Sequence, residues 1–474
     1  MPLIVDLDGT LCRTDTLHEG LLSLAAQRPA ALWRLSGAVR HGKAAFKQRV
    51  TSQAILDPRF LPYDAAVLDL VAAARAEGRQ VALVSAADHR QVEAIATHLG
   101  LFDLAIGTGG PGTDQNLRGQ AKADYLVARF GESGFDYLGD SAADLPVWKA
   151  ARQAYGVRVS PSVQRRAAAN GVDLNRIDGR EGLPFRALIR ACRPHQWAKN
   201  LLILVPVLAS QDLGGLPAAL LAMLCFSLTA SAIYIVNDLL DLPSDRAHPR
   251  KRNRPFAAGR ASPVQGLAVA AVLLVLSILL AALFLPTGFL WILLLYLATT
   301  SLYSLSLKRK MMADVIALAI LYTLRIVAGS AATGIVLSPW LLVFSMFLFF
   351  ALATIKRQAE LEDLASRGGE RTAGRNLLVG DLPIYQAMSI SAAQAAVLVF
   401  ALYSQDAEVQ PHFGIPDLLL LICPVLMLWI GRMQLMTRRG FMTDDPIVFT
   451  LRDRVSLLCG LLMLVIFLVA AVGG

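Results

Sequence analysis

Nine apolar runs after residue 198 are the feature that most constrains the fold. They lie near residues 198–213, 215–236, 265–285, 288–306, 314–333, 339–355, 387–403, 415–431 and 455–473. A helix of about 20 apolar residues crosses the hydrocarbon core of a bilayer. The residues before the first run are much more polar, although the chain as a whole is 55% hydrophobic and 17% charged. The sequence therefore predicts a soluble domain followed by an all-α bundle of nine transmembrane helices.

The connections between these runs alternate in charge. Those after the second, fourth, sixth and eighth runs carry the basic stretches Arg250 to Arg254, Lys308 to Lys310, Lys356 to Arg375 and Arg432 to Arg454. The intervening connections contain no Lys or Arg. The positive-inside rule then predicts a multi-pass protein of the cytoplasmic (inner) membrane, with the soluble domain and the charged loops in the cytoplasm. This topology accounts for the net charge of +9 without a nucleic-acid partner.

One polar cluster stands at the end of the second run. Residues 237–245 read N-D-L-L-D-L-P-S-D, and H-P-R-K-R-N-R-P follows at 248–255. On a helix, Asn237, Asp238, Asp241 and Asp245 would share one stripe. Crowded carboxylates repel one another unless a cation neutralises them, and Mg²⁺ takes such oxygen ligands while bridging to phosphates. The alternative is a solvated helix end. Because Pro243 has no N–H, we expect that no straight helix runs through Asp245.

A single arginine, Arg325, lies inside the fifth run. A charge at that depth costs about 2.5–3.5 kcal/mol on insertion scales. We therefore expect Arg325 to face an acidic partner or a bound anion.

The soluble domain, residues 1–175, has the pattern of a parallel α/β sheet. L-I-V-D-L-D (3–8), V-A-L-V-S (81–85) and F-D-Y-L-G-D-S-A-A-D (135–144) read as buried strands that end in polar residues. Such strand ends meet at one edge of a parallel sheet. Residues 15–75 read as a small helical, basic cap. Residues 176–190 are predicted to be a linker to the membrane domain, residues 191–474.

Together, D-L-D-G-T-L, Ser85, Lys122 and G-D-S-A-A-D resemble the four motifs of haloacid-dehalogenase-like (HAD) phosphatases, which have a Rossmann-like fold. The resemblance implies that Asp6 is the nucleophile and Asp8 the general acid and base. Ser85 and Lys122 would bind the phosphoryl oxygens. The implied magnesium ligands are Asp6, Asp8, Asp140 and Asp144.

The membrane domain resembles the UbiA superfamily of intramembrane prenyltransferases. Y-I-V-N-D-L-L-D-L-P-S-D-R-A-H-P-R-K-R-N-R-P-F-A-A-G is similar to the first aspartate-rich motif of that superfamily. Within it, the motif is closest to the branch that makes polyprenyl-phosphate phosphoribose, the decaprenyl-phosphate phosphoribosyltransferases. R-P-H-Q-W-A-K-N (193–200), Y-S-L-S-L-K (303–308) and K-R-x-x-E (356–360) are further matches. A second D-x-x-x-D motif is missing, because Leu318 stands four residues after Asp314.

This second resemblance implies a bifunctional enzyme. The membrane domain would transfer 5-phosphoribose from phosphoribosyl diphosphate to polyprenyl phosphate, and the HAD domain would remove the 5-phosphate. Asn237, Asp238, Asp241 and Asp245 would hold Mg²⁺. The implied substrate-binding residues of the membrane domain are Lys199, Arg252, Tyr303, Lys308, Asp314, Arg325, Lys356, Arg357 and Glu360.

Two alternatives stay open. One is a prenyltransferase that moves an isoprenoid from its diphosphate to an aromatic or glycerol-phosphate acceptor. The other is a transporter of lipid-linked sugar, or a scaffold, with a regulatory phosphatase domain. The connections on the outer side, which contain no Lys or Arg, argue against this alternative, because a transporter is expected to carry functional polar groups near the midplane or on both faces. The expected partners are phosphoribosyl diphosphate, polyprenyl phosphate and the lipid bilayer, and a homo-oligomer is compatible with the sequence.

Overall fold

The computed structural model describes residues 1–28, 30–31, 43–54, 56–113, 116–177, 184–372, 375–407, 409–442 and 445–472. It divides into two compact units. The first contains Met1–Cys192 and Tyr234–Ala270, and the second contains Arg193–Ile233 and Ala271–Gly474. The aspartate-rich segment thus groups with the N-terminal residues. Of the expected cap, residues 29, 32–42 and 55 lie outside the described part of the chain.

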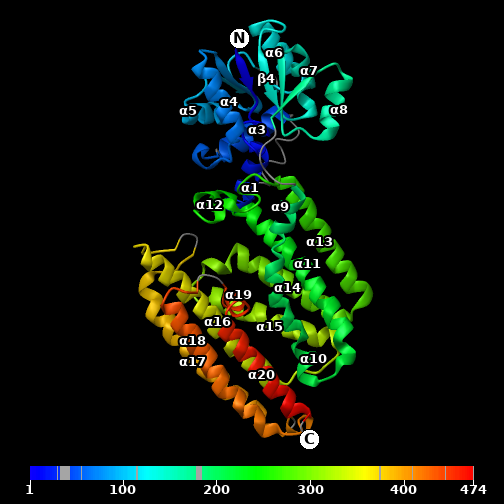
Figure 1. Ribbon diagram of the computed structural model, residues 1–474, viewed down its shortest axis with the longest axis vertical. Helices are drawn as coiled ribbons and strands as arrows, with labels where there is room; N and C mark the ends of the chain where they lie inside the picture. The colour runs from blue at the N-terminus through cyan, green and yellow to red at the C-terminus, as the bar shows by residue number, and fades with distance from the viewer. Residues whose placement is uncertain are drawn as a thin grey trace. The chain divides into compact units, whose positions relative to one another are not determined.

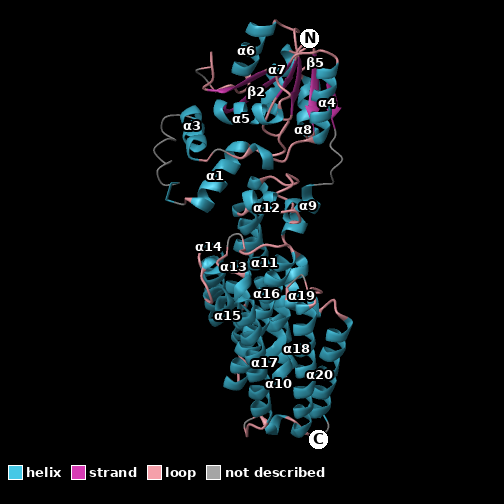
Figure 2. Cartoon of the chain, turned by 90° about the vertical axis from the view of Figure 1, so that its left-hand side faces the viewer, coloured by secondary structure: helices cyan, strands magenta, loops and turns pink. Residues whose placement is uncertain are grey.

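A six-stranded parallel sheet forms the centre of the first unit (Figure 2), in the order β3-β2-β1-β4-β5-β6. The strands are β1 (Leu3–Val5), β2 (Val81–Asp88), β3 (Leu104–Thr108), β4 (Asp136–Gly139), β5 (Gln153–Val157) and β6 (Leu174–Ile177). The strand order reverses at β1, which pairs with β2 on one side and β4 on the other. Ligands of open parallel sheets bind at the carboxyl ends of the strands beside such a switch point. The predicted α/β fold is confirmed.

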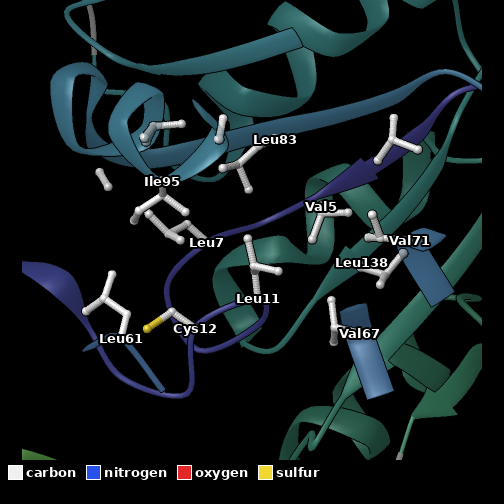
Figure 3. Close-up of a cluster of buried hydrophobic side chains, with 14 of the residues drawn as sticks. Val5, Leu7, Leu11, Cys12, Leu61, Val67, Val71, Leu83, Ile95 and Leu138 are labelled. Carbon is white, nitrogen blue, oxygen red and sulfur yellow. The ribbon is translucent and has the colours of Figure 1, made fainter. Parts of the chain in front are cut away.

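Helices cover both faces of this sheet. Successive strand residues point to opposite sides, and here the side chains on both sides are apolar and must be buried. Val5, Leu83 and Leu138 belong to one fully buried cluster (Figure 3), and their neighbours Ile4 and Tyr137 belong to another. The helices of this region are α1 (Thr16–Gln27), α3 (Lys43–Gln53), η1 (Pro58–Phe60), α4 (Ala65–Ala76), α5 (His89–Leu99), α6 (Gln120–Phe130), η2 (Ala142–Asp144), α7 (Leu145–Ala150), α8 (Pro161–Ala169) and α9 (Pro184–Ala191).

Among the described residues, eight helices rather than the expected nine are long and apolar enough to cross a membrane. The difference lies in the first run, 198–213. It forms the 3₁₀ helix η3 (Pro194–Leu204) and the short α10 (Val205–Ser210), which ends at Gln211 in the left-handed conformation. Six α-helical residues are far fewer than the 17 or so that a spanning helix needs.

The eight candidate spans contain most of the remaining helices (Figure 1). These and the shorter helices between them are η4 (Leu213–Gly215), α11 (Leu216–Leu240), α12 (Leu242–Ala247), η5 (Lys251–Asn253), α13 (Pro263–Phe284), α14 (Thr287–Leu305), η6 (Leu307–Arg309), α15 (Ala313–Thr333), α16 (Pro339–Ser366), η7 (Val379–Asp381), α17 (Leu382–Ser404), η8 (Gln410–His412), η9 (Pro416–Leu421), α18 (Ile422–Arg438), α19 (Pro446–Thr450) and α20 (Arg454–Val472). Large apolar side chains such as Leu283 and Trp291 are exposed. Exposed apolar side chains on long helices are what a lipid environment requires.

Helix α15 is the buried centre of the second unit. It packs against α14, α16 and η3. The approach to η3 is close at Gly329, where an added Cβ would lie 2.1 Å from the carbonyl oxygen of Ile203. Small residues let helix backbones approach in this way inside membranes. This packing places both Asp314 and Arg325 of α15 in the protein interior.

Two candidate active sites

Asp6 and Asp8 lie directly after β1, at the carboxyl edge of the sheet. Gly9 follows with φ of +78°, and a Cβ there would lie 2.2 Å from Oδ2 of Asp140. Only glycine permits both this backbone conformation and this approach. The turn after β1 therefore brings Asp140, from the end of β4, against the first acidic pair.

Asp6, Asp140 and Asp144 form one group of candidate metal ligands, with one carboxylate oxygen from each lying within 4.8 Å of the others. Burial raises the pKa of the Asp6 carboxyl, and Lys122 opposes that rise. Burial, with Asp144 and Asp6 nearby, raises the pKa of Asp140 well above its usual range. A divalent cation would relieve this crowding of acids, and Mg²⁺ takes such oxygen ligands. The donor set thus fits the expected magnesium site.

The carboxyl of Asp8 lies outside this group of ligands. Its Oδ1 accepts a hydrogen bond of 2.8 Å from the backbone N–H of Thr16 at the start of α1. Burial, and next the charge of Asp15, raise the pKa of Asp8 to about 7. A carboxyl with that pKa exchanges a proton readily near neutral pH, which suits a general acid and base.

Lys122 connects the members of this site. Its Nζ lies 3.0 Å from Oδ2 of Asp6 and 3.7 Å from Oδ1 of Asp144. The same Nζ donates to the hydroxyl of Tyr137 at 2.9 Å, and that hydroxyl donates to Asp144 at 2.8 Å. Sequence reasoning missed the role of Tyr137, because an aromatic residue in an apolar strand is usually part of the hydrophobic core. Its hydroxyl nevertheless fixes the positions of Lys122 and Asp144.

Ser85 lies on the neighbouring strand, β2, and a cap lysine, Lys47 of α3, contacts the residue after it. Ser85 is buried, and β2 continues past it to Asp88, beyond the predicted strand end. Lys47 of α3 donates to the carbonyl of Ala86 at 2.6 Å and to Oδ1 of Asn116 at 3.2 Å. Burial lowers the pKa of Lys47. The described part of the cap thus brings a cation to the residue next to Ser85.

The second candidate site is the aspartate-rich loop, defined here as residues 237–260. Helix α11 ends at Leu240, and α12 starts at Leu242 with Asp241 as its N-cap. The interruption two residues before Pro243 agrees with the expectation that no straight helix runs through Asp245. Backbone hydrogen bonds from Asp241 to Asn237 and from Asp245 to Asp241, each 2.9 Å, nevertheless keep the i, i+4 spacing.

A cation already bridges two acids of this loop. Nη1 of Arg254 lies 3.2 Å from Oδ1 of Asp238 and 2.6 Å from Oδ2 of Asp245, and both carboxylates are buried. Burial raises the pKa of Asp245, and Arg254 opposes that rise. Two buried carboxylates that converge on one positive group have the chemistry of a magnesium site. Arg252, from the same basic stretch, is exposed in η5.

In the second unit, two of the expected phosphate-binding lysines meet at an acid that sequence reasoning missed. Asp445, the N-cap of α19, has its Oδ2 2.7 Å from Nζ of Lys199 and 2.9 Å from Nζ of Lys356. The hydroxyl of Tyr322 donates to the same carboxylate at 3.1 Å. The only signal in the sequence was an Asp before a Pro, a common way for a helix to begin.

Arg325 donates to neutral protein acceptors and not to the acidic partner that was one of its two expected partners. It donates to Oδ1 of Asn200 at 2.9 Å and to the hydroxyl of Tyr296 at 3.3 Å, and to a carbonyl of its own helix. Its guanidinium also lies 5.2 Å from the ring centroid of Tyr296 and 5.5 Å from that of Tyr322. Stacking on aromatic rings stabilises a buried cation. In the described residues this charge is therefore held without a carboxylate.

Arg357 is at the centre of a separate network. It is fully buried, with Nε 2.7 Å from Asp314, Nη1 2.7 Å from Glu360 and Nη2 3.0 Å from the hydroxyl of Tyr303. Arg375 also contacts Glu360. Nη1 and Nη2 of Arg357 thus donate to protein acceptors on α16 and α14, whereas its buried Nε lies close to Asp314 without forming a hydrogen bond. These contacts favour a role in holding α14, α15 and α16 together over contact with phosphate. Lys308 lies in η6, after α14.

Comparison with known proteins identifies both parts of the chain. The profile of the UbiA prenyltransferase family matches residues 201–449. The chain belongs to the UbiA prenyltransferase family. The profile of haloacid dehalogenase-like hydrolases matches residues 35–149. The protein is therefore a UbiA-type transferase joined to a HAD-like phosphatase domain.

Three relatives cover different shares of this UbiA-family chain. A Sinorhizobium fredii protein described as "uncharacterized protein y4nM" is 37% identical over 99% of the chain and 91% of its own length. The nodulation protein NoeC of Azorhizobium caulinodans is 36% identical over 60% of the chain and 94% of its own length. A Mycobacterium tuberculosis decaprenyl-phosphate phosphoribosyltransferase is 39% identical over 38% of the chain and 62% of its own length.

Proposed function

We propose that this protein transfers 5-phosphoribose from phosphoribosyl diphosphate to polyprenyl phosphate and then removes the 5-phosphate. The observation that carries the proposal is the aspartate-rich loop, where buried Asp238 and Asp245 converge on one cation. That acidic geometry suits a diphosphate donor bound through Mg²⁺. The similarity to a decaprenyl-phosphate phosphoribosyltransferase supports phosphoribose as the transferred group.

In the transfer step, an oxygen of the lipid phosphate attacks the anomeric carbon of the donor. The bond from that carbon to the diphosphate breaks, and the diphosphate leaves with the electron pair. Asn237, Asp238, Asp241 and Asp245 would hold Mg²⁺, which neutralises the developing charge. The nucleophile is already an anion, so no general base is needed. Lys199 and Lys356 would bind phosphate oxygens when Asp445 gives up its contact with them.

The hydrolytic step uses the HAD-like domain. Asp6 attacks the 5-phosphate, the bond from phosphorus to the ribose oxygen breaks, and Asp8 donates a proton to the departing alkoxide. Water then cleaves the aspartyl-phosphate while Asp8 takes up its proton. Lys122 and Ser85 would orient the phosphoryl oxygens, and Lys122 would keep Asp6 ionised. Mg²⁺ at Asp6, Asp140 and Asp144 would offset the charge of the phosphoryl group.

Both steps are proposed to occur at the cytoplasmic face of the inner membrane. The basic connections after alternate membrane helices support this orientation through the positive-inside rule. A product released at that face would meet the tethered phosphatase domain at a high effective concentration.

The test is to incubate the purified full chain with labelled phosphoribosyl diphosphate, polyprenyl phosphate and Mg²⁺, and to analyse the lipid products. Wild-type protein should yield a ribosyl lipid, and Asp6→Asn should accumulate its 5-phosphorylated form. Absence of any phosphoribosyl lipid would disprove the transfer step. Absence of accumulation in Asp6→Asn would disprove the hydrolytic step.

A parallel reaction with prenyl diphosphates examines the second candidate function, isoprenoid transfer to an aromatic or glycerol-phosphate acceptor. The match to the prenyltransferase family favours that reaction in general terms. Against it stands the position after Asp314, where the second acidic motif typical of those enzymes is replaced by Leu318.

A further inference from the structure

Helix α1 of the HAD-like domain and α12 of the aspartate-rich loop share a buried ion pair. Nη1 and Nη2 of Arg246 lie 2.5 and 2.6 Å from the two carboxylate oxygens of Glu19. The side chains are only 6% and 3% exposed. Both helices belong to the same compact unit and lie side by side in both views (Figures 1 and 2). This bidentate geometry is the strongest form of an arginine–carboxylate contact.

The remaining polar groups around this pair fix each partner to its own segment. Nε of Arg246 donates to the carbonyl of Ala257 at 3.0 Å, which ties α12 to the far end of the loop. On the other side, the hydroxyl of Thr14 donates to Glu19. All three nitrogens of Arg246 thus donate to protein acceptors, Nε to Ala257 and both Nη atoms to Glu19. Its position directly after Asp245 means that anything that moves Arg246 also moves a candidate metal ligand.

A second contact between the same segments is steric. Gly259 of the loop has φ of +69°, and an added Cβ would lie 2.8 Å from Cβ of Arg13 and 3.3 Å from Pro62. Arg13 lies just before the expected cap, and Pro62 lies within the described part of the cap, between η1 and α4. The loop therefore meets the N-terminal residues at two places, through charge at Arg246 near its middle and through close steric approach at Gly259 near its end.

Helix α1 also touches the phosphatase site. The N–H of Thr16, in its first turn, donates to the carboxyl of Asp8. Glu19 stands one turn further along the same helix, and residues three apart lie on the same face. One short helix thus contacts the expected acid–base group of the phosphatase and the expected metal-binding loop of the transferase.

We propose that Glu19 is a positioning residue which, through Arg246, docks the phosphatase domain onto the aspartate-rich loop and holds that loop in its magnesium-binding conformation. The loop is then not autonomous: its affinity for Mg²⁺ depends on a residue of the other catalytic domain. By linkage, binding at the loop must alter α1 to the same thermodynamic extent. The importance of this docking for transfer rests on the proposed function, whereas the docking itself does not.

The experiment uses the full chain and Mg²⁺ alone as the probe. Hydrogen exchange of the backbone amides of residues 241–260 is measured across a Mg²⁺ titration, in wild type, Glu19→Arg, Arg246→Glu and the double charge swap. Glu132→Gln, an exposed acid of the same unit, is the control. Each single reversal should speed exchange in the loop and raise the half-saturating Mg²⁺ concentration by about tenfold, a typical coupling between sites. The double swap should recover most of both effects.

A glycine pair provides a charge-free version of the test. Gly259→Ala should loosen the loop in the same way, because its Cβ meets Arg13. Gly78→Ala is the matched control, since Gly78 has a similar φ of +72° with nothing within 4 Å of the added Cβ. An increase in loop exchange that Gly259→Ala and Gly78→Ala share would be due to backbone strain and not to the contact with Arg13.

Unchanged loop exchange in both single reversals would overturn the docking. Equal damage in the single and double variants would show a purely structural role for Glu19 and would overturn the positioning role. If wild type shows Glu19-dependent Mg²⁺ protection but forms no phosphoribosyl lipid, the docking stands and the proposed function falls.

Discussion

The carboxylate of Asp445 lies 2.7 Å from the ammonium of Lys199, although 246 positions of sequence separate the two residues. Lys356 contacts the same oxygen, so one acid neutralises two cations in the interior of the second unit. Burial disfavours the charged form of Asp445, yet Lys356 and Lys199 hold the pKa of that carboxyl well below its usual range. The acid therefore stays ionised at every physiological pH.

We expect Asp445→Asn to destabilise the protein by about 3–5 kcal/mol, because it leaves the buried ammonium of Lys199 and the partly buried ammonium of Lys356 without a counter-charge. Thermal unfolding in detergent measures the effect. Asp363→Asn is the control: its partner Arg367 is 47% exposed, and such a surface pair contributes about 0–1 kcal/mol. Equal melting temperatures for the two variants would contradict the prediction.

The same pair predicts a pH dependence with a defined sign. A carboxyl whose folded pKa is depressed contributes stability above its unfolded pKa, and loses it as the pH falls through the folded value. The stability gap between wild type and Asp445→Asn should thus narrow as the pH falls below about pH 4, where a free aspartate is protonated. The comparison starts near pH 7, because burial lowers the pKa of Lys199 to about 8 and this partner itself titrates above that range. A gap that narrows between pH 7 and 6 would show that another group is responsible.

Asp245→Asn should raise the Mg²⁺ concentration needed for half-maximal phosphoribosyl transfer by at least about tenfold, the scale expected for loss of a group that tunes a metal site. The reason is its convergence with Asp238 on one cation. Asp212→Asn, an exposed acid in another loop, serves as the control. An unchanged Mg²⁺ requirement in Asp245→Asn would mean that Asp245 only neutralises Arg254.

Gly9→Ala should reduce phosphomonoester hydrolysis by about 100-fold or more, because its Cβ would displace Asp140, and a shift of about 1 Å in a catalytic group costs on that scale. Gly131→Ala is matched for backbone strain, with φ of +85° and nothing within 4 Å. Hydrolysis of a small aryl phosphate by both variants measures the difference. Full activity in Gly9→Ala would contradict the tight approach of the two strand ends.

Cys12 should resist alkylation in the folded protein. Its side chain is fully buried, and burial, with Glu19 nearby, raises the pKa of the thiol to about 12. Only about one thiol in ten thousand would then be ionised at pH 8, and the thiolate is the reactive form. Mass spectrometry after maleimide treatment should find Cys192, which is partly exposed, labelled first. Early labelling of Cys12 would show that α1 opens away from the strand.

The strand ends and the acidic motifs could be predicted because their signal is local. Asp6 and Asp140 directly follow buried apolar strands, and the topology of a parallel sheet brings them to one edge. Lys122 lies in α6, and its role was expected from the resemblance to HAD phosphatases. The convergence of Lys199 and Lys356 on Asp445 could not be predicted, since nothing in a single sequence links residues that meet only through helix packing. Tyr137 was hidden for a different reason: its ring fits an apolar strand, and only its hydroxyl has a polar role.

The membrane part was overcounted by one helix for a similar reason. Hydropathy reports composition, and the run at 198–213 is apolar enough to span. Its two-part structure depends on backbone geometry: a 3₁₀ helix that starts at Pro194 and a left-handed residue at Gln211. Composition alone does not contain either feature.

The pairing of residues 234–270 with the N-terminal residues, rather than with the helices on either side of them, limits how this fusion can be taken apart. The polypeptide leaves the first unit, passes through the second and returns before continuing, so a single cut in the linker does not release an intact module. A gene truncated to its membrane-spanning portion would encode residues 234–270 without the N-terminal residues against which they pack. Recombination that exchanges only the N-terminal domain between relatives must therefore preserve the Glu19–Arg246 and Arg13–Gly259 contacts. In each pair the two residues lie far apart in the sequence, so no single sequence motif contains both.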